Sequence, residues 1–206
     1  GIAVVNVDEE RIESRGAVDE AAGDGPETER SVPVTPPATV RRFPTAAYEA
    51  CRTADQSRTL HDLEALDPKS EHRPAAVVVE ADRGRGKSSA AGLAAGSLAA
   101  RGSDVLVTAP ERRSAAEVFE RAEELLGTLG HLDTGVEDEL TADTGGRVRF
   151  CRPETAAGLP GDPDVIVVDE AAAIPVGRLS AFLDADAVGF FTTVHGYEGA
   201  GQGFSV

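Results

Sequence analysis

One stretch, residues 75–89 (AAVVVEADRGRGKSS), restricts the possible folds more than any other part of the sequence. It begins with a β-branched run at residues 77–79, continues through a basic turn spaced by glycines, and ends in alanine-rich sequence typical of a helix. A strand that leads through such a turn into a helix is the arrangement that binds phosphates. We therefore predict an α/β fold in which this strand is followed by a helix from Lys87 to about Ala100.

The turn itself, ADRGRGKS at residues 81–88, matches the Walker A pattern GxxxxGK(S/T), except that Ala81 replaces its first glycine. The two later glycines let the backbone turn its amides inward, Lys87 supplies a positive charge, and Ser88 supplies a hydroxyl for Mg²⁺. The N-terminus of the helix attracts anions as well. The alternative is an ordinary glycine-rich turn between a strand and a helix. The residues expected to surround the phosphates are Asp82, Arg83, Gly84, Arg85, Gly86, Lys87, Ser88 and Ser89.

A second motif occupies residues 164–175, DVIVVDEAAAIP. Its four consecutive β-branched residues predict a strand buried on both faces, as central parallel strands are. The strand ends in Asp169 and Glu170, the Walker B arrangement, in which the first carboxylate holds Mg²⁺ and the second orients or deprotonates the attacking water. We predict that Lys87, Asp169 and Glu170 are catalytic and that Ser88 and Asp169 bind the metal. The alternative is that the two carboxylates only cap the next helix.

Residues 52–66 (RTADQSRTLHDLEAL) predict an amphipathic helix that begins with a T-x-x-Q capping box formed by Thr53 and Gln56. Gln56 also lies upstream of the Walker lysine, where ATP-driven motor domains hold the adenine. A side-chain amide can donate to and accept from adenine at N6 and N7. Gln56 is therefore a helix cap, an adenine contact, or both.

Further strands are expected at residues 2–7, 104–108, 147–150 and 187–194, and a helix at 111–126 that ends at Gly127. Thr192, Thr193 and His195 follow the last strand, at the edge where open α/β sheets bind ligands, and could sense the γ-phosphate or the hydrolytic water. The acidic residues 131–146 are expected to form a surface excursion. Together these elements predict a P-loop α/β domain of three layers, with a mainly parallel central sheet between helices and a loop-rich N-terminal extension.

The composition is strongly acidic, with 36 acidic against 20 basic residues, only two of them lysines, and a net charge of −16. Such acidity usually argues against a nucleic-acid partner. It is also typical of proteins from a high-salt cytoplasm, where a Debye length of about 3 Å at ~1 M salt weakens the repulsion of phosphates. No apolar run is long enough to span a membrane, and Cys51 and Cys151 have no metal-binding spacing. We expect a soluble, cytoplasmic, halophilic protein with two free thiols rather than a disulfide.

These motifs resemble the helicase-like ATPase module of the tRNA(Met) cytidine acetyltransferase family, in its archaeal form. DEAAAIP followed by TTVHGYEG is much more specific than a Walker pattern. The matching stretches are TADQ at 53–56, ADRGRGKSSAAGLAA at 81–95, VTAP at 107–110, VIVVDEAAAIP at 165–175 and TTVHGYEG at 192–199.

The resemblance implies an enzyme that uses acetyl-CoA and ATP to make N4-acetylcytidine at the wobble position of elongator tRNA(Met). It also implies that residues 1–44 are an extension or linker at the end of a preceding domain. Residues 45–206 would be the first RecA-like ATP-binding lobe, truncated at its C-terminus, and acetyl-CoA would bind only in the full-length protein. The implied roles are adenine contact for Gln56, phosphate contact for residues 84–88, Mg²⁺ binding for Ser88 and Asp169, water activation for Glu170, and coupling of nucleotide state to movement for Thr192 and Thr193.

The sequence departs from the family at Gln202, where relatives commonly carry arginine, and this weakens any expectation of a cationic ATP contact from that loop. Motor ATPases usually complete their site with an arginine from a facing lobe, so the fragment alone is expected to bind Mg-ATP but to hydrolyse it poorly. Two alternatives remain, a RecD-like DNA helicase or repair ATPase and a non-hydrolysing nucleotide-sensing scaffold. An intact Glu170 argues against the scaffold.

Overall fold

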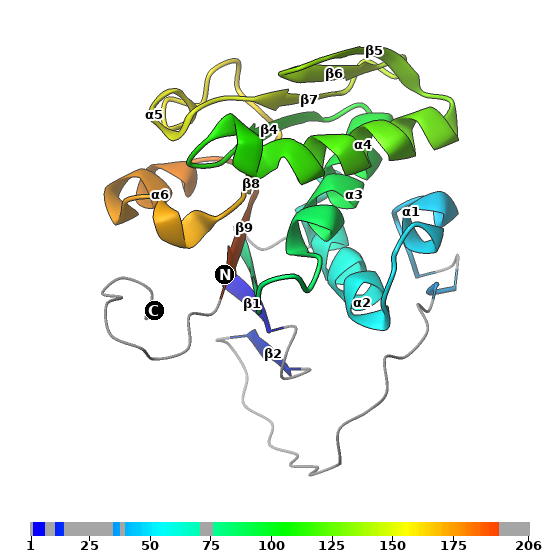
Figure 1. Ribbon diagram of the computed structural model, residues 1–206, viewed down its shortest axis with the longest axis horizontal. Coiled ribbons are helices and arrows are strands. Elements are labelled where there is room, and N and C mark those ends of the chain that lie inside the picture. The colour runs from blue at the N-terminus through cyan, green and yellow to red at the C-terminus, as the bar shows by residue number, and fades with distance from the viewer. Residues whose placement is uncertain (1, 7–10, 15–34, 38–39, 71–75, 194–206) are drawn as a thin grey trace.

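The computed structural model describes residues 2–6, 11–14, 35–37, 40–70 and 76–193 (Figure 1). In this part of the chain, nine strands form one sheet in the order β2-β1-β3-β9-β8-β4-β7-β6-β5. Neighbours in the series β1-β3-β9-β8-β4-β7 are parallel, and the strands added at the two edges are antiparallel. The strands are β1 (Ile2–Asn6), β2 (Arg11–Ser14), β3 (Ala76–Ala81), β4 (Asp104–Thr108), β5 (Leu132–Val136), β6 (Glu139–Ala142), β7 (Arg147–Phe150), β8 (Val165–Val168) and β9 (Val188–Thr193).

Helices cover both faces of the sheet, which gives the three layers expected from the sequence (Figure 1). Helices α1 to α4 pack on one face, and α5 and α6 pack on the other. The helical elements are α1 (Thr45–Glu49), α2 (Ala54–Leu63), η1 (Glu64–Leu66), α3 (Lys87–Ala100), η2 (Arg112–Ala115), α4 (Ala116–Leu129), α5 (Pro153–Ala156), η3 (Ala171–Ala173) and α6 (Val176–Phe182). The prediction of a mainly parallel α/β sandwich is confirmed.

Burial on both faces explains the β-branched runs of the central strands. In β8, Val165 and Val167 belong to the core under α1 to α4, while Ile166 and Val168 belong to the core under α5 and α6. All four side chains are fully buried. A strand that faces two hydrophobic layers has no exposed side, so it carries an uninterrupted apolar run instead of an alternating pattern.

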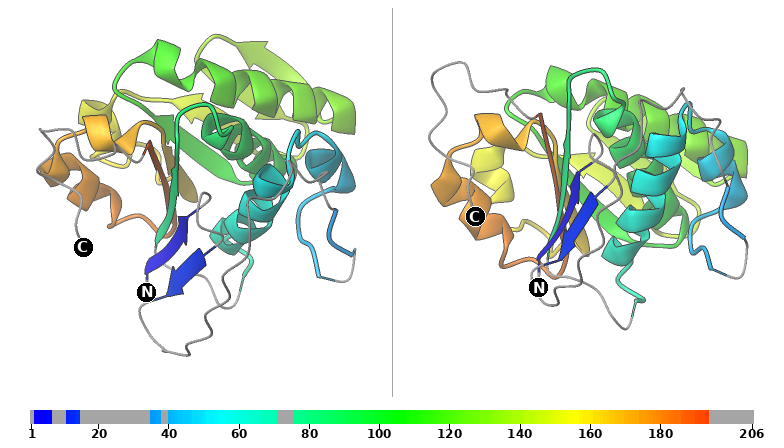
Figure 2. Two further views of the ribbon diagram at one scale, coloured as in Figure 1. Left: turned by 60° about the horizontal axis from the view of Figure 1, so that its bottom comes forward. Right: turned by 90° about the horizontal axis from the view of Figure 1, so that it is seen from below.

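The N-terminal strand predicted at residues 2–7 is present as β1, which pairs in parallel with β3 (Figure 2). The nine-stranded sheet therefore includes β1 and β2, and the domain boundary at residue 44 remains a prediction. Most of the predicted extension or linker, residues 1–44, lies outside the described residues.

Two expectations for the region after β4 were wrong. The helix does not end at Gly127, because α4 continues to Leu129 and Gly130 then takes the left-handed conformation (φ 72°) that ends helices. The acidic residues 131–146 do not form a separate excursion. They contribute the β5–β6 hairpin to the sheet edge, with Leu140 and Ala142 buried in the core and the acidic side chains on the exposed side.

The two cysteines are free, as expected. Cys51 is buried, and burial raises the pKa of its thiol to about 11. None of the helices in the described part of the chain has the length and apolar composition that crossing a membrane would require.

Candidate nucleotide-binding site

The predicted site residues come together at the carboxyl ends of three adjacent parallel strands. The turn at residues 81–88, called the phosphate loop below, follows β3. Thr192 and Thr193 end β9, and the predicted Walker B carboxylates, Asp169 and Glu170, follow β8. Strand β9 lies between the other two, and its register places Thr193 beside Ala81. This edge is where open α/β sheets bind their ligands. His195 and Gln202 lie outside the described residues.

The phosphate loop is shaped by its two glycines. Gly84 (φ 82°) and Gly86 (φ 81°) both have left-handed backbone conformations, which glycine adopts without strain. Lys87 begins α3, and its Nζ donates to Ala81 O (2.7 Å) and Asp82 O (2.9 Å). The ammonium group therefore lies over the mouth of the loop. The N-cap residue of α3 is Gly86, which has no side chain to cap the helix, so the first amides of α3 can serve an anion.

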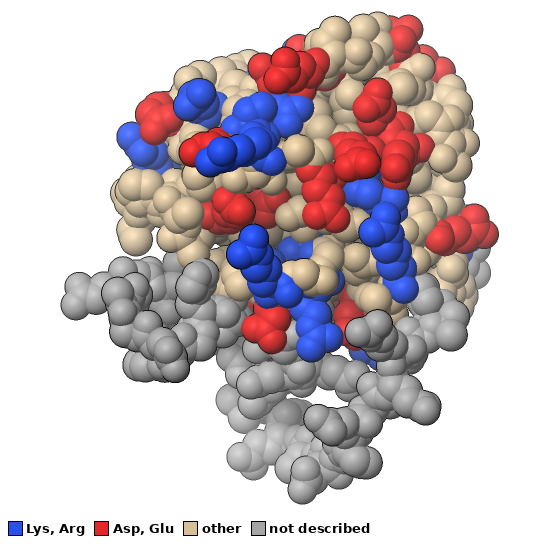
Figure 3. Space-filling view, in the orientation of Figure 1, with Lys and Arg blue, Asp and Glu red and all other residues tan. Residues whose placement is uncertain are grey.

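Charge around this loop differs from that of the molecule as a whole. Asp82, Arg83 and Arg85 are exposed, and Lys87 and Ser88 are partly buried. Figure 3 shows basic side chains gathered over the loop that joins β3 to α3, on a face that carries many acidic side chains elsewhere. An acidic protein therefore presents local positive charge where a polyphosphate would bind.

Ser89 was predicted to contact the nucleotide, but its side chain points into the protein. It is 2% exposed, and its Oγ accepts a hydrogen bond from Arg121 Nε (3.1 Å) on α4. Any contact of Ser89 with a phosphate would have to come from its backbone amide.

Asp169 is held next to the phosphate loop. The residue is 2% exposed, and burial raises the pKa of its carboxyl group, while the Ser88 hydroxyl, the Glu170 amide and the charge of Lys87 act in the opposite direction. Oδ1 accepts from Glu170 N (2.9 Å), whereas Oδ2 is buried without a hydrogen bond of ordinary geometry to any described residue. The structure thus brings Lys87, Ser88 and Asp169 into one cluster.

This cluster fits a magnesium ion bound together with phosphates. Asp169 Oδ2, which is buried without a hydrogen bond, and the neighbouring Ser88 hydroxyl are a suitable pair of oxygen ligands. In the described part of the chain no group of three or more His, Cys, Asp or Glu side chains could hold a metal by itself. Mg²⁺ usually takes its remaining ligands from substrate phosphates and water.

Glu170 has an unusual backbone conformation for a non-glycine residue, with φ 51° and ψ 43°. Such a conformation costs roughly 1–3 kcal/mol, and residues of this kind are concentrated at functional sites. The side chain is exposed, and its Oε2 accepts from Ser114 Oγ (2.8 Å). Ser114 lies in η2, beyond the end of β4, and belongs to none of the sequence motifs.

Gln56 contacts both its own helix and the phosphate loop. Thr53 Oγ1 accepts from Gln56 N (3.2 Å), which confirms the N-cap half of the predicted capping box, but the Gln56 side chain bonds to Arg52 N instead of Thr53 N. The Gln56 side chain is buried, with Oε1 accepting from Arg52 N (2.7 Å) and Nε2 donating to Gly86 O (3.5 Å). A primary amide has two donors and two acceptor sites, so one of each remains for a base. The adenine contact stays a prediction.

Comparison with known proteins identifies the family. The family described as "RNA cytidine acetyltransferase NAT10/TcmA, helicase domain" matches residues 78–206. The tRNA(Met) cytidine acetyltransferase TmcA of Haloferax volcanii is 55% identical over the whole of this chain, that of Haloarcula marismortui 52%, and that of Pyrococcus abyssi 37%. The chain belongs to this cytidine acetyltransferase family.

The chain spans about a quarter of the length of these relatives, 26%, 26% and 25% respectively. Two solved structures of the large terminase ATPase domain of Thermus phage P74-26 are also similar, with TM-scores of 0.43 and 0.41. They are 21% and 22% identical to this chain, cover 65% of it, and are themselves covered to 68% and 69%. The fold assignment given above is based on the strand order and layers of the chain itself.

The two glycines of this family member's phosphate loop offer a matched test of the Gln56 contact. Both have a positive φ, so alanine is strained at either position by about 1–2 kcal/mol. A Cβ on Gly84 would meet nothing within 4 Å, whereas one on Gly86 would lie 1.8 Å from Gln56 Nε2. We expect Gly86→Ala to weaken Mg-ATP binding by the full-length protein at least ~10-fold more than Gly84→Ala. Equal dissociation constants for the two variants would show that Gln56 does not pack against the loop.

Proposed function

We propose that this chain is the ATP-binding and ATP-hydrolysing module of an acetyl-CoA-dependent tRNA cytidine N4-acetyltransferase. The target would be the wobble cytidine of elongator tRNA(Met). Family membership supports the class of enzyme. The observation that carries the ATPase role is the placement of Asp169 beside Ser88 and Lys87, because it joins the two nucleotide motifs into one site.

Each residue of the site has a role in this proposal. The amides of residues 84–88 and the Lys87 ammonium bind the phosphates, and Ser88 and Asp169 hold Mg²⁺, which neutralises developing charge on the phosphates when it is bound. Glu170 orients or deprotonates the attacking water. Gln56 contacts the adenine, and Thr193 lies where the γ-phosphate would be sensed.

Hydrolysis by this module would drive handling of the tRNA, while acetyl-CoA would bind in another part of the full-length protein. The names of the relatives support a tRNA substrate. A cytoplasmic location and adaptation to high salt are part of the proposal, the latter supported by the net charge of −16. At molar salt this charge repels RNA only weakly, because the Debye length is about 3 Å.

An acetylation assay tests the proposal. The full-length protein is incubated with acetyl-CoA, Mg-ATP and tRNA(Met), and N4-acetylcytidine is measured by mass spectrometry. We expect Asp169→Asn to lower ATP-dependent acetylation about 100-fold, because loss of a charge that holds the metal removes stabilisation of the transferring phosphate. Asp164→Asn is the matched control. Asp164 lies at the opposite end of β8, where its carboxylate accepts from Asp104 N (2.8 Å).

Acetylation that needs no ATP, or that Asp169→Asn leaves unchanged, would contradict the proposed role. ATP-dependent unwinding of DNA without acetylation of tRNA would instead favour the DNA-helicase alternative.

A further inference from the structure

Arg121 lies on α4, outside both nucleotide motifs, yet it contacts the two segments that hold the nucleotide site. Its Nε donates to Ser89 Oγ (3.1 Å) in the first turn of α3, and its Nη2 donates to Ala50 O (2.6 Å) after α1. Nη1 pairs with Glu124 on α4 itself. The Arg121 side chain is only 11% exposed. It therefore connects three helical elements from a buried position.

The close approach of α3 and α4 is what allows this reach. A Cβ on Gly92 would lie 2.5 Å from Val118 O and 2.7 Å from Arg121 Cβ. A Cβ on Gly96, one turn later, would lie 3.1 Å from Ala122. The two glycines on α3 thus let α4 come near enough for Arg121 to reach Ser89, which directly follows Ser88.

The contacts of Arg121 continue to Gln56 and return to the phosphate loop. Ala50, held by Arg121, lies two residues before Arg52, whose amide donates to Gln56 Oε1 (2.7 Å). Gln56 Nε2 in turn donates to Gly86 O (3.5 Å), three residues before Ser89. These hydrogen bonds form a closed circuit. It runs from the first turn of α3 through Arg121 to the segment before α2, and from there through Gln56 back to the phosphate loop.

Stability alone does not account for an arginine at this position. Buried ionic groups are often replaced by apolar residues without loss of stability, and an ion pair with an exposed carboxylate contributes little. Glu124, the ionic partner, is 54% exposed. The two buried contacts, to Ser89 and to Ala50 O, are the ones that fix the geometry of the site.

We propose that Arg121 is a positioning residue that sets Gln56 relative to the phosphate loop. It would thereby determine how much the nucleoside adds to the affinity for a bound triphosphate. This inference rests on the proposed ATP-binding function. The phosphate contacts themselves do not involve Arg121, so its loss should affect the nucleoside end of the ligand selectively.

The test compares two ligands, Mg-ATP and inorganic Mg-tripolyphosphate, by calorimetry on the full-length protein. We expect Arg121→Gln to lower the ratio of ATP affinity to tripolyphosphate affinity about 10-fold, the size of one or two lost hydrogen bonds. Tripolyphosphate binding should change less than about 2-fold. A purely structural role would weaken both ligands together or neither.

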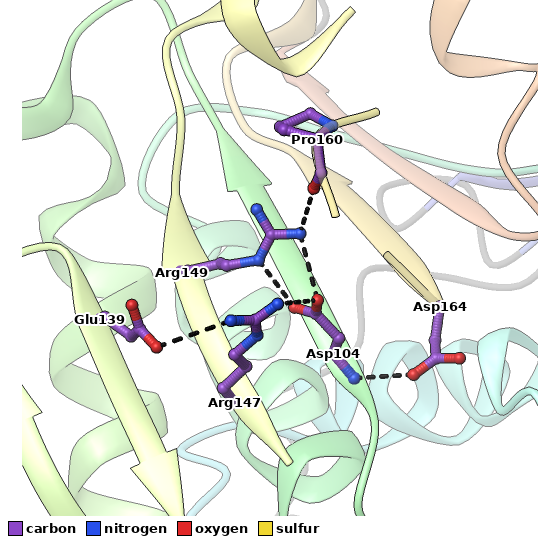
Figure 4. Close-up of polar contacts among 6 residues, drawn as sticks. All are labelled: Asp104, Glu139, Arg147, Arg149, Pro160 and Asp164. Atoms are coloured by element: carbon purple, nitrogen blue, oxygen red, sulfur yellow. Dashed lines mark hydrogen bonds and ion pairs between the residues drawn. The ribbon is translucent and has the colours of Figure 1, made fainter. Parts of the chain in front are cut away.

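Arg149→Gln is the matched control (Figure 4). Arg149 is also 11% exposed and bonds to a carboxylate, Asp104 (2.9 Å), and to a backbone carbonyl, Pro160 O (2.6 Å). Its contacts lie at the amino ends of β4 and β8, the edge opposite the phosphate loop. Arg149→Gln should leave the affinity ratio unchanged.

A double-mutant cycle shows whether Arg121 acts through Gln56. The ratio for Gln56→Ala should fall as well, and adding Arg121→Gln should lower it little further, because coupled residues are not additive. If Arg121→Gln does not fold, Arg121→Lys is measured in its place. Lysine can reach only one of the two partners, Ser89 Oγ or Ala50 O, so the ratio of ATP affinity to tripolyphosphate affinity should be intermediate. An unchanged ratio in the folded variant, or full additivity with Gln56→Ala, overturns the inference.

The outcomes separate this inference from the proposed function. Wild-type protein that binds neither ligand contradicts the proposed ATP site itself. Equal affinities of the wild-type protein for ATP and tripolyphosphate would support the phosphate site but contradict the proposed role of Arg121 and Gln56.

Discussion

Replacing Glu170 by glutamine should lower the rate of ATP hydrolysis by roughly 10²–10⁴-fold while Mg-ATP still binds. Glutamine has nearly the same shape but carries no charge and cannot accept the proton of the attacking water. The residues proposed to hold the nucleotide, Lys87, Ser88 and Asp169, are untouched. Phosphate release in single turnovers and equilibrium binding of Mg-ATP, both on the full-length protein with tRNA present, measure the two effects separately.

Glu154→Gln provides the control for this change. Glu154 is an exposed glutamate on α5 that pairs with Arg178 (2.9 Å), and exposed ion pairs contribute little. Hydrolysis should be unaffected. A Glu170→Gln variant that hydrolyses ATP like the wild type would mean that Glu170 does not activate the attacking water. Wild-type protein that binds ATP without hydrolysing it would favour the nucleotide-sensing scaffold.

The core of the fold could be predicted because its signals are local. A β-branched run followed by glycines, a lysine and small residues predicts a strand, a loop and a helix, and β3 (Ala76–Ala81) and α3 (Lys87–Ala100) are where the sequence places them. The same holds for β8, since only a strand buried on both faces needs an uninterrupted apolar run. The Walker motifs then specify which strand ends must meet.

The order of strands in the sheet was not predicted, because it depends on packing between distant segments. Nothing in the sequence says that β9 separates β3 from β8 and so brings Thr193 beside Ala81. The hairpin at the far edge was missed for a related reason. Its first strand, β5, has four exposed residues in five and therefore lacks the alternation by which strands are recognised.

The residues that support the site were missed because their roles exist only in three dimensions. Ser114 lies in η2, which follows β4, the strand next to β8, and it contacts Glu170 although the two residues are 56 positions apart in the sequence. Arg121 reaches Ser89 and Ala50 only because glycines bring α3 and α4 together. On the sequence alone, Arg121 is one more charged residue on an amphipathic helix.

The central claim is that the loop between β3 and α3 binds the phosphates of ATP, and titration of Mg-ATP into full-length wild-type and Lys87→Ala proteins tests it most directly. Lys87 Nζ donates to Ala81 O and Asp82 O at the mouth of the loop. A bound triphosphate would replace these carbonyl groups as the partner of the ammonium group. Losing a charge-assisted contact of this kind costs about 2–5 kcal/mol. Lys69, the only other lysine, serves as control, since its Nζ donates to Arg101 O (2.9 Å) away from the loop.

Titrations at matched high salt should show at least a ~30-fold rise in the Mg-ATP dissociation constant for Lys87→Ala and none for Lys69→Ala. An unchanged dissociation constant in a folded Lys87→Ala protein would contradict the assignment of this loop as the phosphate site.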